Sequence, residues 1–265
     1  MDQVDVGGLR IAYERAGHGP PLVLLHGFVG DGRSTFGQQI DDLSDEFTVV
    51  AWDGPGAGRS ADPPASFRLP DYADCLAGFV AALELDRPHV VGLSYGAALA
   101  LQLAGAYPHV PRSLVLAGAY AGWAGSLPAP EVEQRLASSL RAAELAPEQF
   151  VGALLPTMFS AAAAPERVAG FAAAVPQFHP AGFRAMARAM AAADLRAVLP
   201  AIDVPTLLLC GEKDDRAPLR VAEALHAAIP TSRLVVLTGV GHVSSVEAPE
   251  RFNQEVRHFL QDHTR

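Results

Sequence analysis

Short, continuously apolar segments recur along the chain, and they constrain its fold more than any other feature of the sequence. Each segment is four or five residues long. The six segments are 21–25, 48–52, 89–93, 113–116, 206–210 and 234–237. Runs of this length are typical of strands that are buried on both faces of a sheet. Residues 9–14 alternate between apolar and polar side chains instead, and this pattern predicts the edge strand of a hairpin.

Helical patterns separate these predicted strands. They cover residues 70–85, 95–106, 219–228 and 249–261. Strands that alternate with helices predict right-handed crossovers, so the expected fold class is α/β, with a mainly parallel sheet flanked by helices. A length of 265 residues is ordinary for a single domain of this class.

One segment breaks the alternation of strands and helices. Residues 121–200 contain 24 Ala among 80 residues, and prolines divide the segment into short helical pieces. We therefore predict a helical insertion at 121–200 in a core built from residues 1–120 and 201–265. Apolar residues at helical spacing usually pack in a core. Four apolar side chains of the insertion are nevertheless candidates for binding a substrate, namely Trp123, Met158, Phe159 and Phe178.

The balance of charge excludes several classes of partner. The formal net charge is −9, and only 20 residues are Lys or Arg. Nucleic acids and acidic membranes both bind basic surfaces, so we expect neither as a partner. The acidic N-terminus and the lack of a strongly apolar stretch of about 20 residues predict a soluble, cytoplasmic protein. The sequence leaves open whether copies of the chain form a homo-oligomer.

The pentapeptide Gly92-Leu93-Ser94-Tyr95-Gly96 fits the pattern G-x-S-x-G. A predicted strand ends at Leu93 and a predicted helix begins at Tyr95, which is the strand–turn–helix setting of a nucleophilic serine. The free N–H groups at the start of a helix also favour negative charge. The alternative is an ordinary glycine-flanked exit from a strand.

A serine hydroxyl needs a base, and the base needs an acid to orient it. His242 follows the predicted strand 234–237, and Asp214 and Asp215 follow the strand 206–210. The carboxyl ends of parallel strands share one edge of the sheet, so either aspartate can meet His242 near Ser94. A backbone N–H in the segment 26–28 would form an oxyanion hole with that of Tyr95. A lone loop histidine can equally be a solvated surface residue.

These motifs, in this order, resemble those of the α/β-hydrolase-fold serine hydrolases. The motifs are His26–Gly30, Asp53–Ser60, Gly92–Gly96, Gly211–Asp214 with Pro218, and Gly241-His242 with Glu247–Phe252. The resemblance implies Ser94 as nucleophile, His242 as base and Asp214 as acid, with oxyanion donors at Phe28 and Tyr95. It also implies that residues 121–200 form a cap over the active site. Among subfamilies, the chain looks most similar to 3-oxoadipate enol-lactonase-like hydrolases and small cofactor-free carboxylesterases.

The leading hypothesis is a hydrolase that cleaves a small-molecule carboxylic ester or lactone through an acyl-enzyme on Ser94. No metal or other cofactor is needed for this reaction, and no Cys or His cluster has a metal-ligand spacing. The alternatives are carbon–carbon bond hydrolysis, perhydrolysis or acyl transfer at the same site. A non-catalytic binding protein is a further alternative, because a fold does not guarantee a function.

The segment Gly56–Ala61 formally fits the dinucleotide-binding pattern G-x-G-x-x-A. Pro63 and Pro64 follow it directly, where the phosphate-binding helix would have to run. We therefore interpret its glycines as a tight loop near the pocket, and not as a nucleotide site.

Overall fold

A computed structural model describes residues 2–174 and 179–264 of the chain. This part of the chain forms an eight-stranded sheet in the order β1-β2-β4-β3-β5-β6-β7-β8. The strands are β1 (Asp2–Val6), β2 (Leu9–Ala16), β3 (Pro21–Leu25), β4 (Thr48–Trp52), β5 (His89–Leu93), β6 (Ser113–Ala117), β7 (Thr206–Gly211) and β8 (Ser232–Leu237). All six strands predicted from apolar runs are therefore present, with boundaries shifted by at most two residues.

The first two strands depart from the prediction. β1 and β2 form an antiparallel hairpin, and β2 also pairs antiparallel with β4. The hairpin was predicted correctly, but placing residues 9–14 at the edge was wrong, because β1 is the edge strand of the described sheet. β1 was not predicted, because Asp2, Gln3 and Asp5 are exposed and only Val4 and Val6 are apolar.

The strands β3 to β8 are parallel to one another, and their carboxyl ends lie at one edge of the sheet. Leu25 of β3 lies opposite Trp52 of β4 and Gly92 of β5. Ala117 of β6 lies opposite Leu93 of β5 and Leu209 of β7. Every residue of β4, β5, β6 and β7 is buried. Burying each of their Val and Leu side chains contributes about 1.5–3 kcal/mol relative to exposure. These well-packed strands therefore hold the residues at this edge of the sheet in fixed positions.

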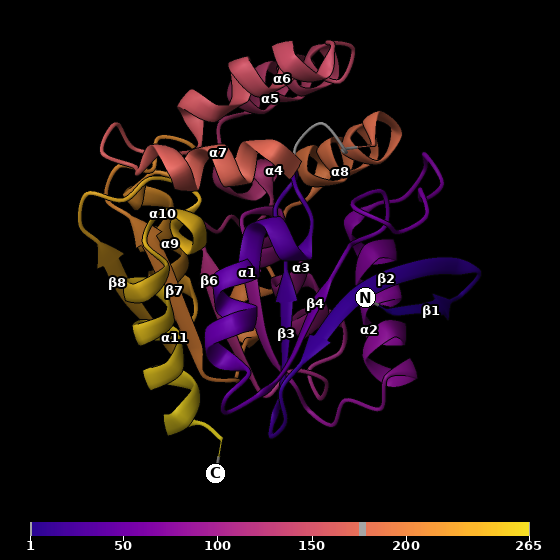
Figure 1. Ribbon diagram of the computed structural model, residues 1–265, viewed down its shortest axis with the longest axis vertical. Helices are drawn as coiled ribbons and strands as arrows, with labels where there is room; N and C mark the ends of the chain where they lie inside the picture. The colour runs from indigo at the N-terminus through magenta and orange to yellow at the C-terminus, as the bar shows by residue number, and fades with distance from the viewer. Residues whose placement is uncertain (1, 175–178, 265) are drawn as a thin grey trace.

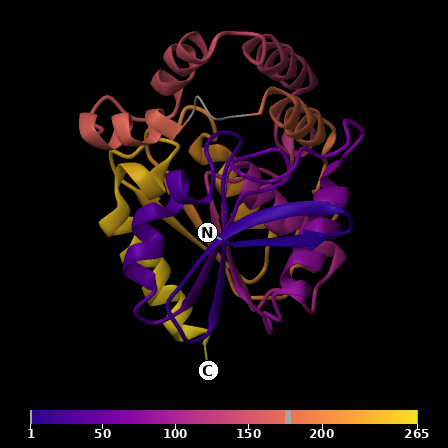
Figure 2. The same ribbon diagram turned by 45° about the vertical axis from the view of Figure 1, so that its right-hand side comes forward.

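Helices cover both faces of the sheet (Figures 1 and 2). On one face lie α1 (Gly32–Leu43) and α11 (Pro249–Asp262), and on the other lie α2 (Leu69–Ala82), α3 (Tyr95–Ala106) and α9 (Leu219–Ala228). The four predicted helices correspond to α2, α3, α9 and α11. Helix α1 was missed, although its capping box gives a signal: Asp31 accepts from the Ser34 N–H, and the Ser34 hydroxyl accepts from the Asp31 N–H.

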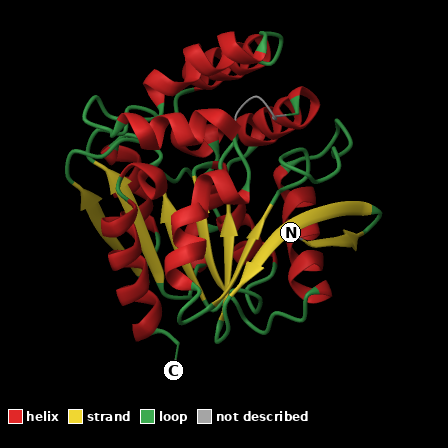
Figure 3. Ribbon diagram, viewed as in Figure 1, coloured by secondary structure: helices red, strands yellow, loops and turns green. Residues whose placement is uncertain are grey.

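In the described residues between β6 and β7, the insertion contains helices joined by loops and no strand. Its helices are α4 (Trp123–Ser126), α5 (Ala129–Ala142), α6 (Pro147–Leu154), α7 (Pro165–Ala174) and α8 (Pro180–Ala192). They lie above the carboxyl ends of the parallel strands (Figure 3). Helix α8 packs closely on the loop after β4, because a Cβ atom on Gly182 would overlap the backbone of Gly56. The insertion therefore faces the edge of the sheet at which Ser94 lies.

Candidate active site

Ser94 occupies a sharp turn between β5 and α3. Its φ of 55° lies in a region that side chains other than glycine rarely adopt. Glycine on either side makes the turn possible, because a Cβ on Gly92 would overlap the Gly96 carbonyl, and one on Gly96 would overlap the Leu25 carbonyl. The backbone holds the Ser94 side chain at the start of α3, where it is half-buried.

Two backbone N–H groups beside Ser94 have no acceptor among the described residues. One belongs to Tyr95, the first residue of α3, and the other belongs to Phe28. The loop that contains Phe28 passes close to the serine: a Cβ on Gly27 would lie 3.8 Å from the Ser94 Cβ. The Tyr95 ring points away into the core, against the rings of Phe28 and Tyr72. The arrangement offers two N–H donors to an oxyanion formed at Ser94.

His242 and Asp214 form a buried pair. His242 Nδ1 lies 2.8 Å from Asp214 Oδ2, and the two side chains are 3% and 0% exposed. The other carboxylate oxygen of Asp214 accepts from the N–H groups of Arg216 and Ala217, at 2.9 and 2.8 Å. An ionised carboxylate only accepts hydrogen bonds, so beside an ionised Asp214 a neutral His242 would carry its proton on Nδ1 and its lone pair on Nε2.

The pair lies beside the Ser94 turn. The Ser94 N–H donates to the carbonyl of Ala117 at the end of β6, at 2.8 Å. The next residue, Gly118, leaves room for the imidazole, because a Cβ there would lie 3.0 Å from His242 Cε1 and Nδ1. Asp215, the alternative acid, is exposed. The structure thus brings Ser94, His242 and Asp214 to one edge of the sheet and leaves Asp215 outside the pair.

The His242 loop is tied to the insertion through Glu247. The Glu247 carboxylate accepts hydrogen bonds from the N–H groups of Gly241 and Ser160, each at 3.1 Å, and from the Ser160 hydroxyl. The Val243 N–H donates to the carbonyl of Met158, at 3.0 Å. Glu247 thus connects the backbone directly before the histidine to Ser160 of the insertion.

The Asp53–Ser60 motif makes a loop near the site. Asp53 accepts from the N–H groups of Gly32 and Arg59, both at 3.0 Å, and burial raises the pKa of its carboxyl. His26 Nε2 accepts from the Gly54 N–H at 2.8 Å, and its Nδ1 lies 2.6 Å from the Gly27 carbonyl oxygen. Both His26 nitrogens thus contact backbone groups, so the ring connects the loop after β3 to the loop after β4.

A cavity of about 500 Å³ lies between the insertion and the core. Of the predicted substrate-binding residues, Trp123 and Met158 line it, and Trp123 packs edge-on against Phe28 at 5.4 Å. Phe159 is not among the lining residues and packs against Phe171 of α7 instead. Phe178 lies outside the described residues. Phe28 also lines the cavity, whereas Ser94, His242 and Asp214 are not among its lining residues.

Sequence reasoning missed the charged residues of this cavity. Arg135 of α5 pairs with Glu131 at 2.8 Å and donates to the Tyr120 hydroxyl at 2.8 Å and the Arg216 carbonyl at 3.0 Å. Burial raises the pKa of Tyr120 to about 12. The spacing of Glu131 and Arg135 signals a helical ion pair, but nothing in the sequence showed that α5 would cover Arg216.

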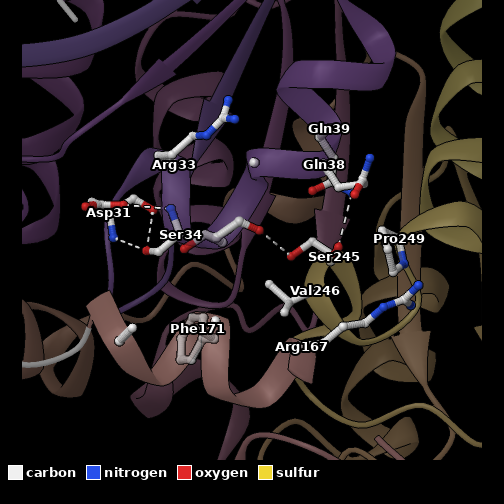
Figure 4. A pocket seen from close by; sticks show the side chains of 14 residues that line it. Asp31, Arg33, Ser34, Gln38, Gln39, Arg167, Phe171, Ser245, Val246 and Pro249 are labelled. Carbon is white, nitrogen blue, oxygen red and sulfur yellow. Dashed lines mark hydrogen bonds between the residues drawn. The ribbon is translucent and has the colours of Figure 1, made fainter. Parts of the chain in front are cut away.

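A second cavity, of about 520 Å³, lies between α1, α7 and α10 (Ser244–Glu247). Figure 4 shows Phe171 and Arg167 on α7, with Val246 between them and Arg167 extending toward Pro249. None of the predicted site residues lines this cavity. In the described part of the chain, no group of three or more His, Cys, Asp or Glu side chains is arranged to hold a metal ion. No described helix is long and apolar enough to span a membrane.

Comparison with known proteins places the chain in a family. A family model for the alpha/beta hydrolase fold matches residues 20–249. The chain belongs to the α/β-hydrolase fold family. This confirms the predicted family and fold class, and with them the prediction of a hydrolytic enzyme.

Individual relatives cover nearly the whole chain. The serine hydrolase BPHL of Mus musculus is 28% identical over 98% of this chain and 86% of its own. A thermophilic esterase from Thermogutta terrifontis superposes with a TM-score of 0.92 at 29% identity, over 100% of both chains. The enol-lactonase from Burkholderia xenovorans LB400 has a TM-score of 0.89 at 26% identity, over 98% of this chain and 100% of that one.

Proposed function

We propose that this α/β-hydrolase cleaves a carboxylic ester or lactone through an acyl-enzyme on Ser94. The observation that carries the proposal is the buried His242–Asp214 hydrogen bond of 2.8 Å beside the Ser94 turn. An apolar core has no need of a buried imidazole–carboxylate pair, and charged groups are costly to bury without a partner. A pair oriented in this way can activate a neighbouring hydroxyl.

The residues have distinct roles in the proposed mechanism. His242 Nε2 takes the Ser94 proton as the Ser94 oxygen bonds to the substrate carbonyl carbon. The N–H groups of Phe28 and Tyr95 bind the resulting oxyanion, and His242 protonates the leaving alkoxide as the ester bond breaks. Water, deprotonated by His242, then attacks the acyl-enzyme; the acid leaves and Ser94 regains its proton. Asp214 holds the imidazole and stabilises its cation throughout.

We also propose that residues 121–200 act as a cap that selects a small substrate. The cavity of about 500 Å³ beneath the insertion has the size of a small-molecule site, for which about 300–1,000 Å³ is usual. Trp123 and Met158 form part of its apolar wall. The similarity to an esterase and to an enol-lactonase, at 29% and 26% identity, supports an ester or lactone as substrate.

Hydrolysis of p-nitrophenyl esters from acetate to laurate, by the wild type and by Ser94→Ala, tests the proposal. We expect turnover by the wild type and a loss of about 10³-fold or more in kcat for Ser94→Ala, as is usual when a catalytic nucleophile is removed. The melting temperature of the variant shows whether the fold is intact. A folded variant with more than about 1% of wild-type activity contradicts the mechanism, since triad removal costs far more.

Failure of every ester would redirect the search. A lactone panel follows first, because the same acyl-enzyme serves both bonds. Carbon–carbon bond hydrolysis, perhydrolysis or acyl transfer would then be the next reactions to assay. Inactivity on all of them would favour a binding protein.

A further inference from the structure

Arg216 is a cation at the wall of the cavity beneath the insertion, and among the described residues no carboxylate forms an ion pair with it. Its side chain is half-buried and lines the cavity. Within the described residues it donates one hydrogen bond, from Nη1 to the Thr157 hydroxyl at 2.8 Å, and it makes no ion pair with a carboxylate. Burial lowers the pKa of its guanidinium, although the charge of Asp214 acts in the opposite direction, and an arginine stays charged near neutral pH. A partly desolvated guanidinium of this kind is unfavourable until an anion binds it.

The other charged side chains near the cavity either have a partner or are exposed to solvent. Arg135 and Glu131 neutralise each other through their ion pair of 2.8 Å. Asp214 is committed to His242 and to two backbone N–H groups. Asp215 lines the cavity too, but its side chain is exposed and forms no ion pair with Arg216 in the described part of the chain. Arg216 is therefore the cation of the cavity that is available to a ligand.

Its position is fixed relative to the reacting groups. The Arg216 N–H donates to Asp214, and the Arg216 carbonyl accepts hydrogen bonds from Tyr120 and Arg135. The backbone that positions the catalytic acid thus also positions this side chain. Apolar groups such as Phe28 and Trp123 line the same cavity, so a ligand has both an apolar surface and one cation to bind.

We propose that Arg216 binds a carboxylate that the substrate carries away from the scissile bond. The inference rests on the proposed hydrolase function and names its substrate class, an ester or lactone of a molecule with a second, free acid group. A carboxylate fits better than a phosphate, because one guanidinium neutralises one negative charge and the neighbouring Asp215 disfavours a dianion. The planar guanidinium can also bind both carboxylate oxygens at once.

Matched pairs of substrates test the assignment. The p-nitrophenyl monoester of glutaric acid is compared with p-nitrophenyl valerate for a charge on the acyl side. 4-Carboxyphenyl acetate is compared with phenyl acetate for a charge on the alcohol side. We expect Arg216→Gln to lower the ratio of kcat/KM, anionic over neutral, by about ten- to a hundredfold in one series, mainly through KM. Arg216→Lys should give a ratio between those of the wild type and Arg216→Gln, since it keeps the positive charge but lacks the planar guanidinium that binds both carboxylate oxygens.

Two further variants act as controls. Arg220→Gln removes an exposed arginine on α9 and should leave the ratio unchanged. Asp215→Asn removes the competing negative charge and should raise the ratio. Because the ratio is measured within one protein sample, partial misfolding of a variant cancels.

The outcomes separate this inference from the proposed function. If Ser94→Ala abolishes turnover but Arg216→Gln leaves the ratio unchanged in both series, the hydrolase stands and the role of Arg216 is refuted. If the wild type cleaves no ester, the anion site is tested instead by measuring the melting temperature with and without glutarate. A rise in melting temperature for the wild type that is lost in Arg216→Gln supports the anion site. No rise in the wild type overturns it.

Discussion

The core sheet and the insertion at 121–200 are stabilised in different ways. Every residue of β4 to β7 is buried, whereas within the insertion α8 buries eight residues and α5 buries none. Ser94, His242 and Asp214 all follow strands of the core, and the insertion supplies most of the other wall of the cavity. In the proposed function, the core supplies the reacting groups, whereas most of the cavity that would hold the substrate is lined by the insertion.

Polar contacts join the two regions at several places, two of which lie near the candidate site. Glu247 connects the His242 loop to Ser160, and Arg135 connects α5 to Tyr120 and Arg216. A change in the core should therefore abolish the reaction, and a change at a junction should weaken it while loosening the insertion.

The largest effect is expected in the core, at the catalytic acid. Asp214→Asn should lower kcat/KM on neutral esters by about 10⁴-fold, because the amide cannot hold the imidazole in the required tautomer. Asp215→Asn should stay within about threefold, as expected for an exposed side chain outside the pair. Ester kinetics of the two variants decide between the aspartates. Equal losses would show that Asp214 does not have the role we propose.

A smaller effect is expected at the junction. Glu247→Ala removes three hydrogen bonds to a carboxylate and should destabilise the fold by about 3 kcal/mol, with a loss of activity from the displaced Gly241-His242 backbone. The matched control is Glu250→Ala, which breaks an exposed pair with Arg167 and should cost less than about 1 kcal/mol. Urea unfolding measures both. A Glu247→Ala variant as stable and active as Glu250→Ala would show that Glu247 is not needed to hold the His242 loop against the insertion.

The smallest effect concerns stability of the core alone. Burial lowers the pKa of His89 to about 4, below the ordinary value for histidine. The unfolded chain therefore binds a proton that the folded chain rejects as the pH falls from about 6.5 to 4, and stability declines over that window. Between pH 7.5 and pH 5 this amounts to about 2 kcal/mol. In His89→Gln the difference between the two pH values, measured by urea unfolding, should shrink by that amount; the exposed His258→Gln serves as control.

Much of the core could be predicted from the sequence because its local signals agree with its tertiary contacts. A continuous apolar run such as Val49–Trp52 is buried on both faces wherever it lies in a parallel sheet. The turn at Ser94 was predictable because glycine is required by close backbone contacts on both sides. β1 and α1 were missed because their residues are largely polar and acquire a role only through their neighbours.

The cavity could not be predicted to the same extent. Phe159 and Met158 are adjacent and equally apolar, yet only Met158 lines the cavity. Which of them does so depends on how the His242 loop binds the insertion, through the Val243–Met158 hydrogen bond. The position of Arg216 likewise depends on Tyr120 and Arg135, which lie 96 and 81 residues away in the chain.

In the proposed reaction, Ser94 becomes acylated during each turnover. The most direct test mixes the protein with a p-nitrophenyl ester, quenches with acid within the first turnovers, and measures peptide masses. We predict the mass of the acyl group on the peptide that contains Ser94 in the wild type, and its absence in Ser94→Ala. Steady turnover without an adduct on that peptide, or with the adduct on another residue, would contradict the account.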